Sequence, residues 1–254
     1  MEISEFDIVT LPYGRLQPPA ADSVDIWLLP LQDLAPPLTR SLNQDANPET
    51  EAAQRLTRKM MLRLLLAAYL QRPAREIRLA QGAAGKPFIS QPGDSGLHFS
   101  QTHCLDYVMI AIGGRERLGI DMEPISRLVS DPLAVARRYF ARAEYEYLAT
   151  IEHPSRRREA FLRLWTRKEA VVKATGGGIV SGLHRFTVDD RTRPPRVSAC
   201  DDGNASDWHL LHLEPSPGLI GTLASDHPLT TVNAYRVSPP LAPVTQISER
   251  KRQP

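Results

Sequence analysis

The sequence predicts an α+β fold with two lobes, because helical and strand patterns occur in each half of the chain. Apolar residues follow helical spacing over residues 49–70 in the first half and over 159–175 in the second half. Short apolar runs typical of strands flank these segments, and glycines and prolines separate them. The 254 residues are enough for one large domain or two small ones, and enough to bury a sizeable core.

The first half is predicted to hold one helix and three strands. A strand over residues 25–29 ends at a proline, and a helix over residues 49–70 ends shortly before another proline. Residues 82–96 are rich in glycine and proline, so we expect a loop there. Two strands follow over residues 97–100 and 107–112, and the second is an almost continuous apolar run.

The second half is predicted to hold two helices and five strands. A strand over residues 118–122 precedes a helix over residues 131–151, and a second helix covers residues 159–175. Three glycines end this second helix. Four further strands are expected over residues 186–188, 208–213, 219–224 and 231–237.

A glycine-containing turn at residues 113–117 marks the expected boundary between the lobes. We therefore predict an N-terminal lobe over residues 1–115 and a C-terminal lobe over residues 116–240. The chain beyond Ser238 is polar and rich in proline, so we expect a flexible tail over residues 241–254.

The composition excludes several classes of function. The chain has 31 Lys and Arg against 29 Asp and Glu, so its net charge of +2 argues against a nucleic-acid coat or an acidic tail as the main theme. No apolar stretch reaches the roughly 18 residues of a membrane span, and the acidic N-terminus does not resemble a secretory signal. Two cysteines cannot build a disulfide framework. We therefore expect a cytoplasmic protein with neither membrane nor nucleic acid as a partner.

The strand over residues 118–122 leads into the first candidate site. Alternate side chains of a strand share a face, so Asp121 and Glu123 project together, roughly 7 Å apart. Neighbouring carboxylates repel each other unless a proton or a cation joins them, and Mg²⁺ prefers oxygen ligands. The pair therefore indicates a magnesium site; the alternative is a solvent-facing strand with two ordinary acids.

Glu169 and Lys173 form a second candidate pair, one turn apart on the helix over residues 159–175. One interpretation is a surface ion pair worth about 0.3–0.5 kcal/mol. The other is a metal-binding carboxylate beside an ammonium group that meets a phosphate. The glycines at 176–178 would let the backbone approach a ligand closely, although a helix cap explains at least one of them.

Two weaker segments precede these. Residues 99–103 end in His103, whose ring at a strand end would suit a phosphate or acid–base chemistry. Gly85, Lys86 and Pro87 fit a turn that holds a cation near backbone amides. Taken singly, each segment is as readily explained by a structural role.

Together, the four segments resemble the surfactin-type family of 4′-phosphopantetheinyl transferases, in that family's order. The family pattern is G-K-P, F-N-x-S-H, G-[IV]-D-x-E and W-x-x-K-E-A-x-x-K-x-x-G-x-G. The matching stretches are residues 85–87, 99–103, 119–123 and 165–178. The resemblance covers roughly residues 55–224, and two further stretches agree with it: the basic residues 59–63, and residues 138–140 followed by Glu144.

Three positions depart from the family pattern. Ser100 stands where the family often has Asn, and Thr102 replaces a Ser while keeping a hydroxyl donor. Leu105 replaces a frequent Gly after the histidine. These departures concern ligand contacts more than the reaction, since all three acidic positions are intact.

The resemblance implies an enzyme that moves the 4′-phosphopantetheine arm of coenzyme A to a serine of an apo acyl or peptidyl carrier protein and releases adenosine 3′,5′-bisphosphate. It implies that Asp121, Glu123 and Glu169 hold Mg²⁺, with Mn²⁺ as an alternative. It implies catalytic roles for Asp121, Glu169 and Lys173. Lys173 would meet the pyrophosphate, and Glu169 would take the serine proton directly or through a water on the metal.

The resemblance also implies the coenzyme A contacts. Arg63 and His103 are expected near the 3′-phosphate, and Lys86 with Pro87 near the adenine. Thr102 and Lys173 complete the expected set of cofactor-binding residues.

The family fold is a pseudo-dimer of two similar α/β lobes with coenzyme A in the cleft between them, and we expect a monomer. A non-catalytic binding protein on this fold is one alternative, but no acidic ligand is lost. An unrelated Mg²⁺-dependent phosphotransferase is another, but the chain has no G-x-x-x-x-G-K-[ST] loop. The carrier proteins could serve fatty-acid, polyketide or peptide synthesis.

Overall fold

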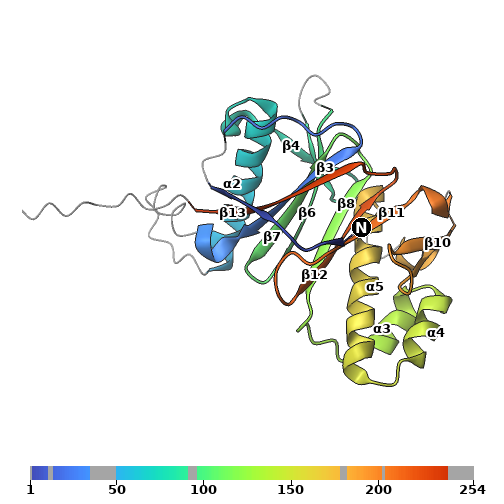
Figure 1. The fold of residues 1–254 in the computed structure, drawn as a ribbon. Coiled ribbons are helices and arrows are strands. Elements are labelled where there is room, and N and C mark those ends of the chain that lie inside the picture. The colour runs from blue at the N-terminus through green and yellow to red at the C-terminus, as the bar shows by residue number, and fades with distance from the viewer. Residues whose placement is uncertain are drawn as a thin grey trace, which may run out of the picture.

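The computed structural model describes residues 2–10, 14–34, 50–90, 96–177, 182–201 and 204–239. Over these ranges the chain has the predicted α+β fold, with two sheets in the centre and a long helix against each (Figure 1). The expected tail over residues 241–254 and the third glycine of the 176–178 run lie outside the described residues.

The first sheet has five strands and is covered on its outer face by helix α2 (Glu51–Leu70). The Thr50 hydroxyl accepts a hydrogen bond from the Ala53 N–H (3.2 Å) and so caps the start of α2, as a threonine at this position commonly does. The strands, in spatial order, are β2 (Asp7–Thr10), β13 (Thr231–Ser238), β3 (Ser23–Pro30), β7 (Tyr107–Gly113) and β6 (His98–Cys104).

The second sheet is covered by helix α5 (Pro154–Thr175), with α3 (Pro132–Tyr139) and α4 (Arg142–Thr150) packed against α5. Within the described ranges, none of the helices has both the length and the apolarity to cross a bilayer. The strands run in the order β8 (Leu118–Pro124), β12 (Leu219–Ser225), β11 (His209–Leu213), β10 (Arg196–Cys200) and β9 (Phe186–Asp189), and β1 (Glu2–Ile3) pairs with β11.

Smaller elements complete the described chain. A hairpin of β4 (Leu79–Gln81) and β5 (Pro87–Ile89) carries the glycine–lysine–proline turn. Three single 3₁₀ turns lie at Ala74–Glu76, Leu183–Arg185 and Ala205–Asp207.

Strand alternation stacks the two sheets and two helices into four layers. On β3, Trp27 and Leu29 point to α2, whereas Ile26 and Leu28 point to the second sheet. All four side chains are almost fully buried, and β8 contributes Ile120 to the same inter-sheet core. The apolar side chains of β8 therefore face the core between the two sheets.

The sheets exchange strands across the expected lobe boundary. β13, which the sequence assigns to the C-terminal lobe, pairs in parallel with β3 in the first sheet. β1 pairs in parallel with β11 in the second sheet. The lobe boundary between residues 115 and 116 stays a prediction. Each of the two sheets contains strands from both sides of that boundary.

Several expected boundaries differ in the structure. The helix expected over residues 131–151 is broken at Phe140, whose extended backbone separates α3 from α4. Phe140 stacks on Phe161 of α5 (ring centroids 5.3 Å apart), and the Glu144 carboxylate accepts the Ala141 N–H (2.8 Å). The packing of Phe140 therefore accompanies the end of α3, and the Glu144 contact caps the start of α4, without a glycine or proline between them.

The loop expected over residues 82–96 contains β5, and the second long helix starts at Pro154, five residues before its expected start. Strand β10 was not predicted. Its pairing with β9 shifts register between Val197 and Ala199, which interrupts the alternation that marks a strand in sequence.

Candidate active site

A cleft of ≈ 780 Å³ opens between helix α2 on one side and strand β8 with helix α5 on the other. Its size falls in the range of cofactor sites in proteins. Seven of the nine predicted site residues line it together: Pro87, Thr102, His103, Asp121, Glu123, Glu169 and Lys173. Among the described cleft residues, Asp121, Glu123 and Glu169 come from β8 and α5, and one further carboxylate, Glu51, comes from α2.

Gly119 allows β8 to lie directly against α5. A Cβ atom at this position would come within 1.9 Å of the Ala170 carbonyl oxygen and 2.5 Å of the Ala174 nitrogen, both backbone atoms of α5. This close approach brings the β8 carboxylates next to the helix that carries Glu169. The glycine of the G-I-D-x-E motif therefore has a packing reason in this fold.

Asp121 is buried and tied to two neighbours through one oxygen. Its Oδ1 accepts hydrogen bonds from Lys173 Nζ (2.7 Å) and from Thr102 Oγ1 (3.1 Å). Its Oδ2 is buried without a partner among the described residues. Burial raises the pKa of Asp121, and Lys173 partly opposes that rise.

Glu169 shows the same deficit more strongly. Its Oε1 is buried without a partner among the described residues, and the side chain is almost fully buried. Burial, with the nearby Asp121 charge, raises the pKa of Glu169 to about 7. Two orphaned carboxylate oxygens in one cleft suit a hard divalent cation, so the residues present fit Mg²⁺.

Glu123 is ion-paired with Arg127, four residues further along the chain. The Arg127 guanidinium also lies over the ring of Trp165 on α5, 5.4 Å from its centroid. Burial raises the pKa of Glu123, and Arg127 opposes the rise. Neither Arg127 nor the face that Trp165 presents to the cleft was identified from the sequence.

The opposite wall of the cleft is mainly basic, with Glu51 of α2 beside three basic side chains. Arg55, Arg58 and Lys59 line it from α2, at spacings that share one helix face, and His103 lies near them on β6. Burial lowers the pKa of His103, and the Arg58 charge lowers it further. The helix period groups these arginines in the sequence, but it does not show which face of the helix meets the cleft.

Arg63 and Lys86 are placed differently from the other predicted contacts. The Arg63 guanidinium donates to the Ile77 carbonyl, and Arg63 is not among the residues that line the cleft. Lys86 Nζ donates to the carbonyls of Leu118 (3.2 Å) and Ala174 (3.3 Å) at the ends of β8 and α5. Burial lowers the pKa of Lys86, and its role as a coenzyme A contact stays a prediction.

The Leu105 departure from the family pattern also has a local consequence. Leu105 adopts a left-handed backbone conformation (φ 48°) in the turn between β6 and β7, and its side chain is exposed. A glycine would occupy this conformation without strain, which explains why the family favours one here.

Lys168 points away from the cleft, although it lies next to Glu169 in the motif. Its Nζ contacts the Glu144 carboxylate (2.7 Å) and the Phe186 carbonyl (2.6 Å), and both charged side chains are fully buried. The Val188 N–H also donates to Glu144 (2.8 Å). This pair ties α5 to α4 and β9 and is structural.

Replacing Lys168 by Met is expected to lower the free energy of unfolding by about 3–5 kcal/mol, because Glu144 is left buried without its counter-charge. Urea denaturation measures the loss. The double variant K168M/E144Q should recover part of it, since no buried charge remains. Equal losses in the single and double variants would contradict the explanation by charge.

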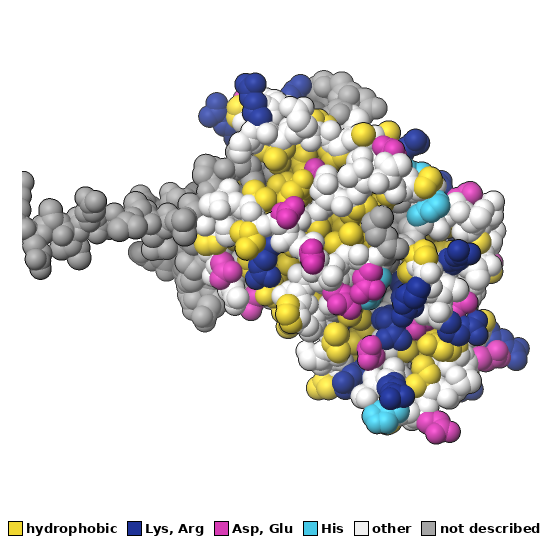
Figure 2. All heavy atoms as spheres, viewed as in Figure 1, with side chains coloured by type: hydrophobic (Ala, Val, Ile, Leu, Met, Phe, Trp, Pro, Cys, Tyr) yellow, Lys and Arg dark blue, Asp and Glu magenta, His cyan; other side chains and the backbone are white. Residues whose placement is uncertain are grey.

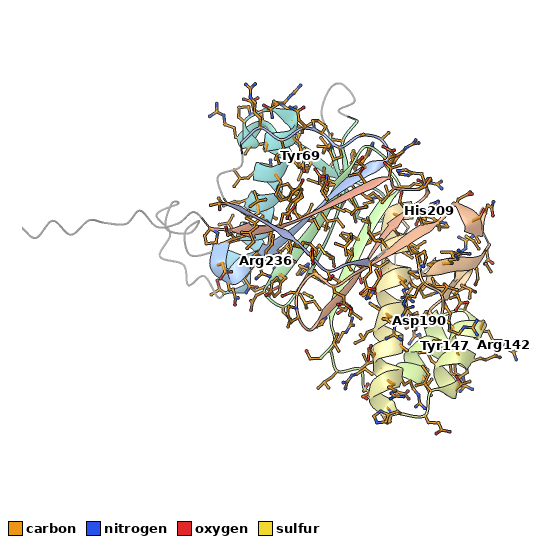
Figure 3. All side chains as sticks on the ribbon, viewed as in Figure 1. Tyr69, Arg142, Tyr147, Asp190, His209 and Arg236 are labelled. Atoms are coloured by element: carbon orange, nitrogen blue, oxygen red, sulfur yellow. The ribbon has the colours of Figure 1, made fainter. Side chains whose placement is uncertain are left out.

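A second buried charge network lies between α4, α5 and β9. Asp190 accepts a hydrogen bond from Tyr147 Oη (3.1 Å), and Figure 3 labels both residues. Asp190 also accepts from Arg163 Nη2 (2.8 Å), and Arg167 is ion-paired with it. Arg167 Nε and Nη2 are buried without partners among the described residues. These residues do not line the cleft.

An acidic wall that faces a basic wall across one cleft is typical of enzymes that bind a polyphosphate group with the help of a divalent cation. Residues 117–232 match the 4′-phosphopantetheinyl transferase superfamily. This chain belongs to that superfamily.

Individual relatives agree with the family match. The chain is 30% identical over 215 residues to 4′-phosphopantetheinyl transferase HetI of Nostoc sp., covering 80% of this chain and 88% of the relative. It is 34% identical over 138 residues to 4′-phosphopantetheinyl transferase psf-1 of Bacillus pumilus, covering 54% and 56%. It is 26% identical over 170 residues to human L-aminoadipate-semialdehyde dehydrogenase-phosphopantetheinyl transferase, covering 64% and 55%.

Proposed function

We propose that this chain is a surfactin-type 4′-phosphopantetheinyl transferase that modifies a serine of an apo acyl or peptidyl carrier protein with the phosphopantetheine arm of coenzyme A. The observation that carries the proposal is the cleft itself. Asp121 Oδ2 and Glu169 Oε1 are buried there without partners, and basic residues of α2 stand opposite. A cation would pair with the carboxylates of one wall, and a polyanion that binds with it would pair with the basic side chains of the other.

In this proposal the serine oxygen attacks the β-phosphorus of coenzyme A, and the bond to adenosine 3′,5′-bisphosphate breaks. Asp121, Glu123 and Glu169 hold Mg²⁺, which when bound neutralises charge on the pyrophosphate. Lys173 lies at the edge of the acidic group and moves its charge from Asp121 toward the phosphates. Glu169 would accept the serine proton directly or through an intervening water.

The basic wall would receive the phosphates of coenzyme A. Arg55, Arg58 and Lys59 are added to His103 as candidates for the 3′-phosphate, since all four line the cleft. Thr102 holds Asp121, and Pro87 lines the cleft beside them. Lys86 would act by fixing the ends of β8 and α5 near the adenine, and Arg63 by fixing α2 to the Ile77 carbonyl.

The proposed protein partner is an acidic carrier protein. Lys and Arg side chains gather on the part of the surface that α4, α5 and β10 occupy (Figure 2). Arg137, Arg138 and Arg142 on α3 and α4 are exposed and would steer an acidic partner at low ionic strength. We propose a cytoplasmic monomer.

The test is to incubate the full chain with coenzyme A, Mg²⁺ and a panel of apo carrier proteins, and to weigh the products by mass spectrometry. The expected result is a phosphopantetheine adduct on a carrier serine. The carrier that reacts fastest identifies the pathway that the enzyme serves. Absence of an adduct on every carrier, with folded protein, would contradict the proposed function.

Replacing Arg58 or His103 by Ala is expected to weaken coenzyme A binding about tenfold, because a hydrogen bond to a charged group contributes roughly 1.5–3 kcal/mol. Binding of dephospho-coenzyme A should change little, so the preference for coenzyme A narrows. Isothermal titration with both ligands measures the preference. Equal weakening for both ligands would place these side chains away from the 3′-phosphate.

A further inference from the structure

Arg127 stands at the mouth of the cleft and carries three contacts. Its N–H donates to the Pro124 carbonyl (2.9 Å), which forms a turn directly after β8. Its guanidinium is ion-paired with Glu123 and lies over the ring of Trp165. The side chain is 40% exposed, whereas that of Glu123 is 16% exposed. The backbone of Arg127 is therefore fixed while its charged end faces both the cleft and solvent.

Basic side chains are paired with two of the three carboxylates that would bind a cation. Arg127 occupies Glu123 and Lys173 occupies Asp121. A divalent cation that enters alone must compete with these charges for the same oxygens and is repelled by them. Binding of the cation is therefore weakened until Arg127 and Lys173 pair with other groups.

A polyanion in the cleft supplies those partners. Arg127 lines the same cleft as the basic residues of α2, so its guanidinium can turn from Glu123 to a phosphate without leaving the cleft. The guanidinium can stay in contact with the Trp165 ring as it turns, since cations bind aromatic faces. Release of Glu123 then gives the cation its full set of carboxylates.

We propose that Arg127 is a positioning residue that couples entry of the divalent cation to entry of the polyphosphate substrate. It pairs with Glu123 before the two ligands bind, and it binds a phosphate when the cation takes Glu123. The inference rests on the proposed function for the identity of the polyanion as coenzyme A. By reciprocity of coupled binding, coenzyme A tightens cation binding as much as the cation tightens coenzyme A binding.

The test measures Mn²⁺ affinity by electron paramagnetic resonance, without and with saturating coenzyme A and without carrier protein. In R127Q, Mn²⁺ should bind the free protein about three- to tenfold more tightly than in the wild type, because a competing charge is gone. The gain in Mn²⁺ affinity on adding coenzyme A should shrink by a similar factor. R127K keeps the charge, so its Mn²⁺ affinity in the free protein should stay close to that of the wild type.

R142Q is the matched control. Arg142 pairs with Glu146 at the same spacing of four residues, but the pair is on the exposed outer side of α4 (Figure 3). This variant should leave Mn²⁺ affinity unchanged. Unchanged or weaker Mn²⁺ binding to free R127Q would overturn the inference and show that Arg127 supports Glu123 instead of competing for it. Absence of transfer by the wild type contradicts the proposed function separately.

Discussion

Glu169→Gln is expected to lower phosphopantetheine transfer by at least about 100-fold, because loss of a general base alone commonly has an effect of this size. The amide cannot accept the serine proton, and it is a poorer ligand for Mg²⁺ than a carboxylate. The mass-spectrometric transfer assay measures the rate. Glu159→Gln is the control, since Glu159 lies on the same helix and its side chain is 52% exposed.

The same substitution is expected to stabilise the metal-free fold at pH 8. The pKa of Glu169 is about 7 in the folded chain against 4.5 for the free side chain, so the folded state holds a proton that the unfolded state has lost between these values. Stability therefore falls as pH rises from about 4.5 to 7. Above pH 7 the buried carboxylate costs about 3 kcal/mol, and the neutral amide avoids that cost.

Thermal unfolding with a chelator present separates these effects. Glu169→Gln should melt several degrees above the wild type at pH 8, and the difference should shrink at pH 5, where both side chains are neutral. Near wild-type turnover in this variant would remove Glu169 from the reaction. A melting difference that is independent of pH would show that the carboxylate is not the source of the instability.

Local sequence patterns predicted which acidic side chains share a face of one element, because a strand and a helix each have a fixed period. The family resemblance was needed to propose that they form one site. The alternation of side chains along β8 is enough to place Asp121 and Glu123 on one face. The helical spacing of four is enough to place Glu169 and Lys173 on one face of α5. The contact between β8 and α5 that brings these two pairs together depends on Gly119. In the sequence, nothing distinguishes Gly119 from the other glycines of the motifs. Which surfaces lie against each other is decided by tertiary packing.

The basic side of the site shows the limit of local patterns. On α2 the family resemblance implied Arg63 as the phosphate contact, but Arg58 lines the cleft and Arg63 donates to the Ile77 carbonyl. By helical spacing, Lys168 falls within an apolar stripe of α5. The structure shows that its charge is neutralised by Glu144, which lies 24 residues earlier in the chain. Such pairs join distant segments, so no spacing within one element predicts them.

Gly119→Ala is expected to destabilise the fold by at least about 3 kcal/mol and to abolish transfer. The added Cβ would meet the backbone of α5 at 1.9 Å, and forced overpacking of this kind costs roughly 1–3 kcal/mol even where side chains can adjust. Here the atoms that must move belong to the Ala170 and Ala174 backbone, so a smaller side chain at either position brings no relief.

The activity loss follows from the same contact, because β8 must move away from α5 and carry Asp121 and Glu123 away from Glu169. A displacement of about 1 Å in a catalytic group can lower a rate about 100-fold. Urea denaturation and the transfer assay measure the two effects, with Gly14→Ala as the control, since an added Cβ there meets no atom within 4 Å. If Gly119→Ala keeps wild-type stability, β8 and α5 do not touch at this point, and the acidic group needs another explanation for its assembly.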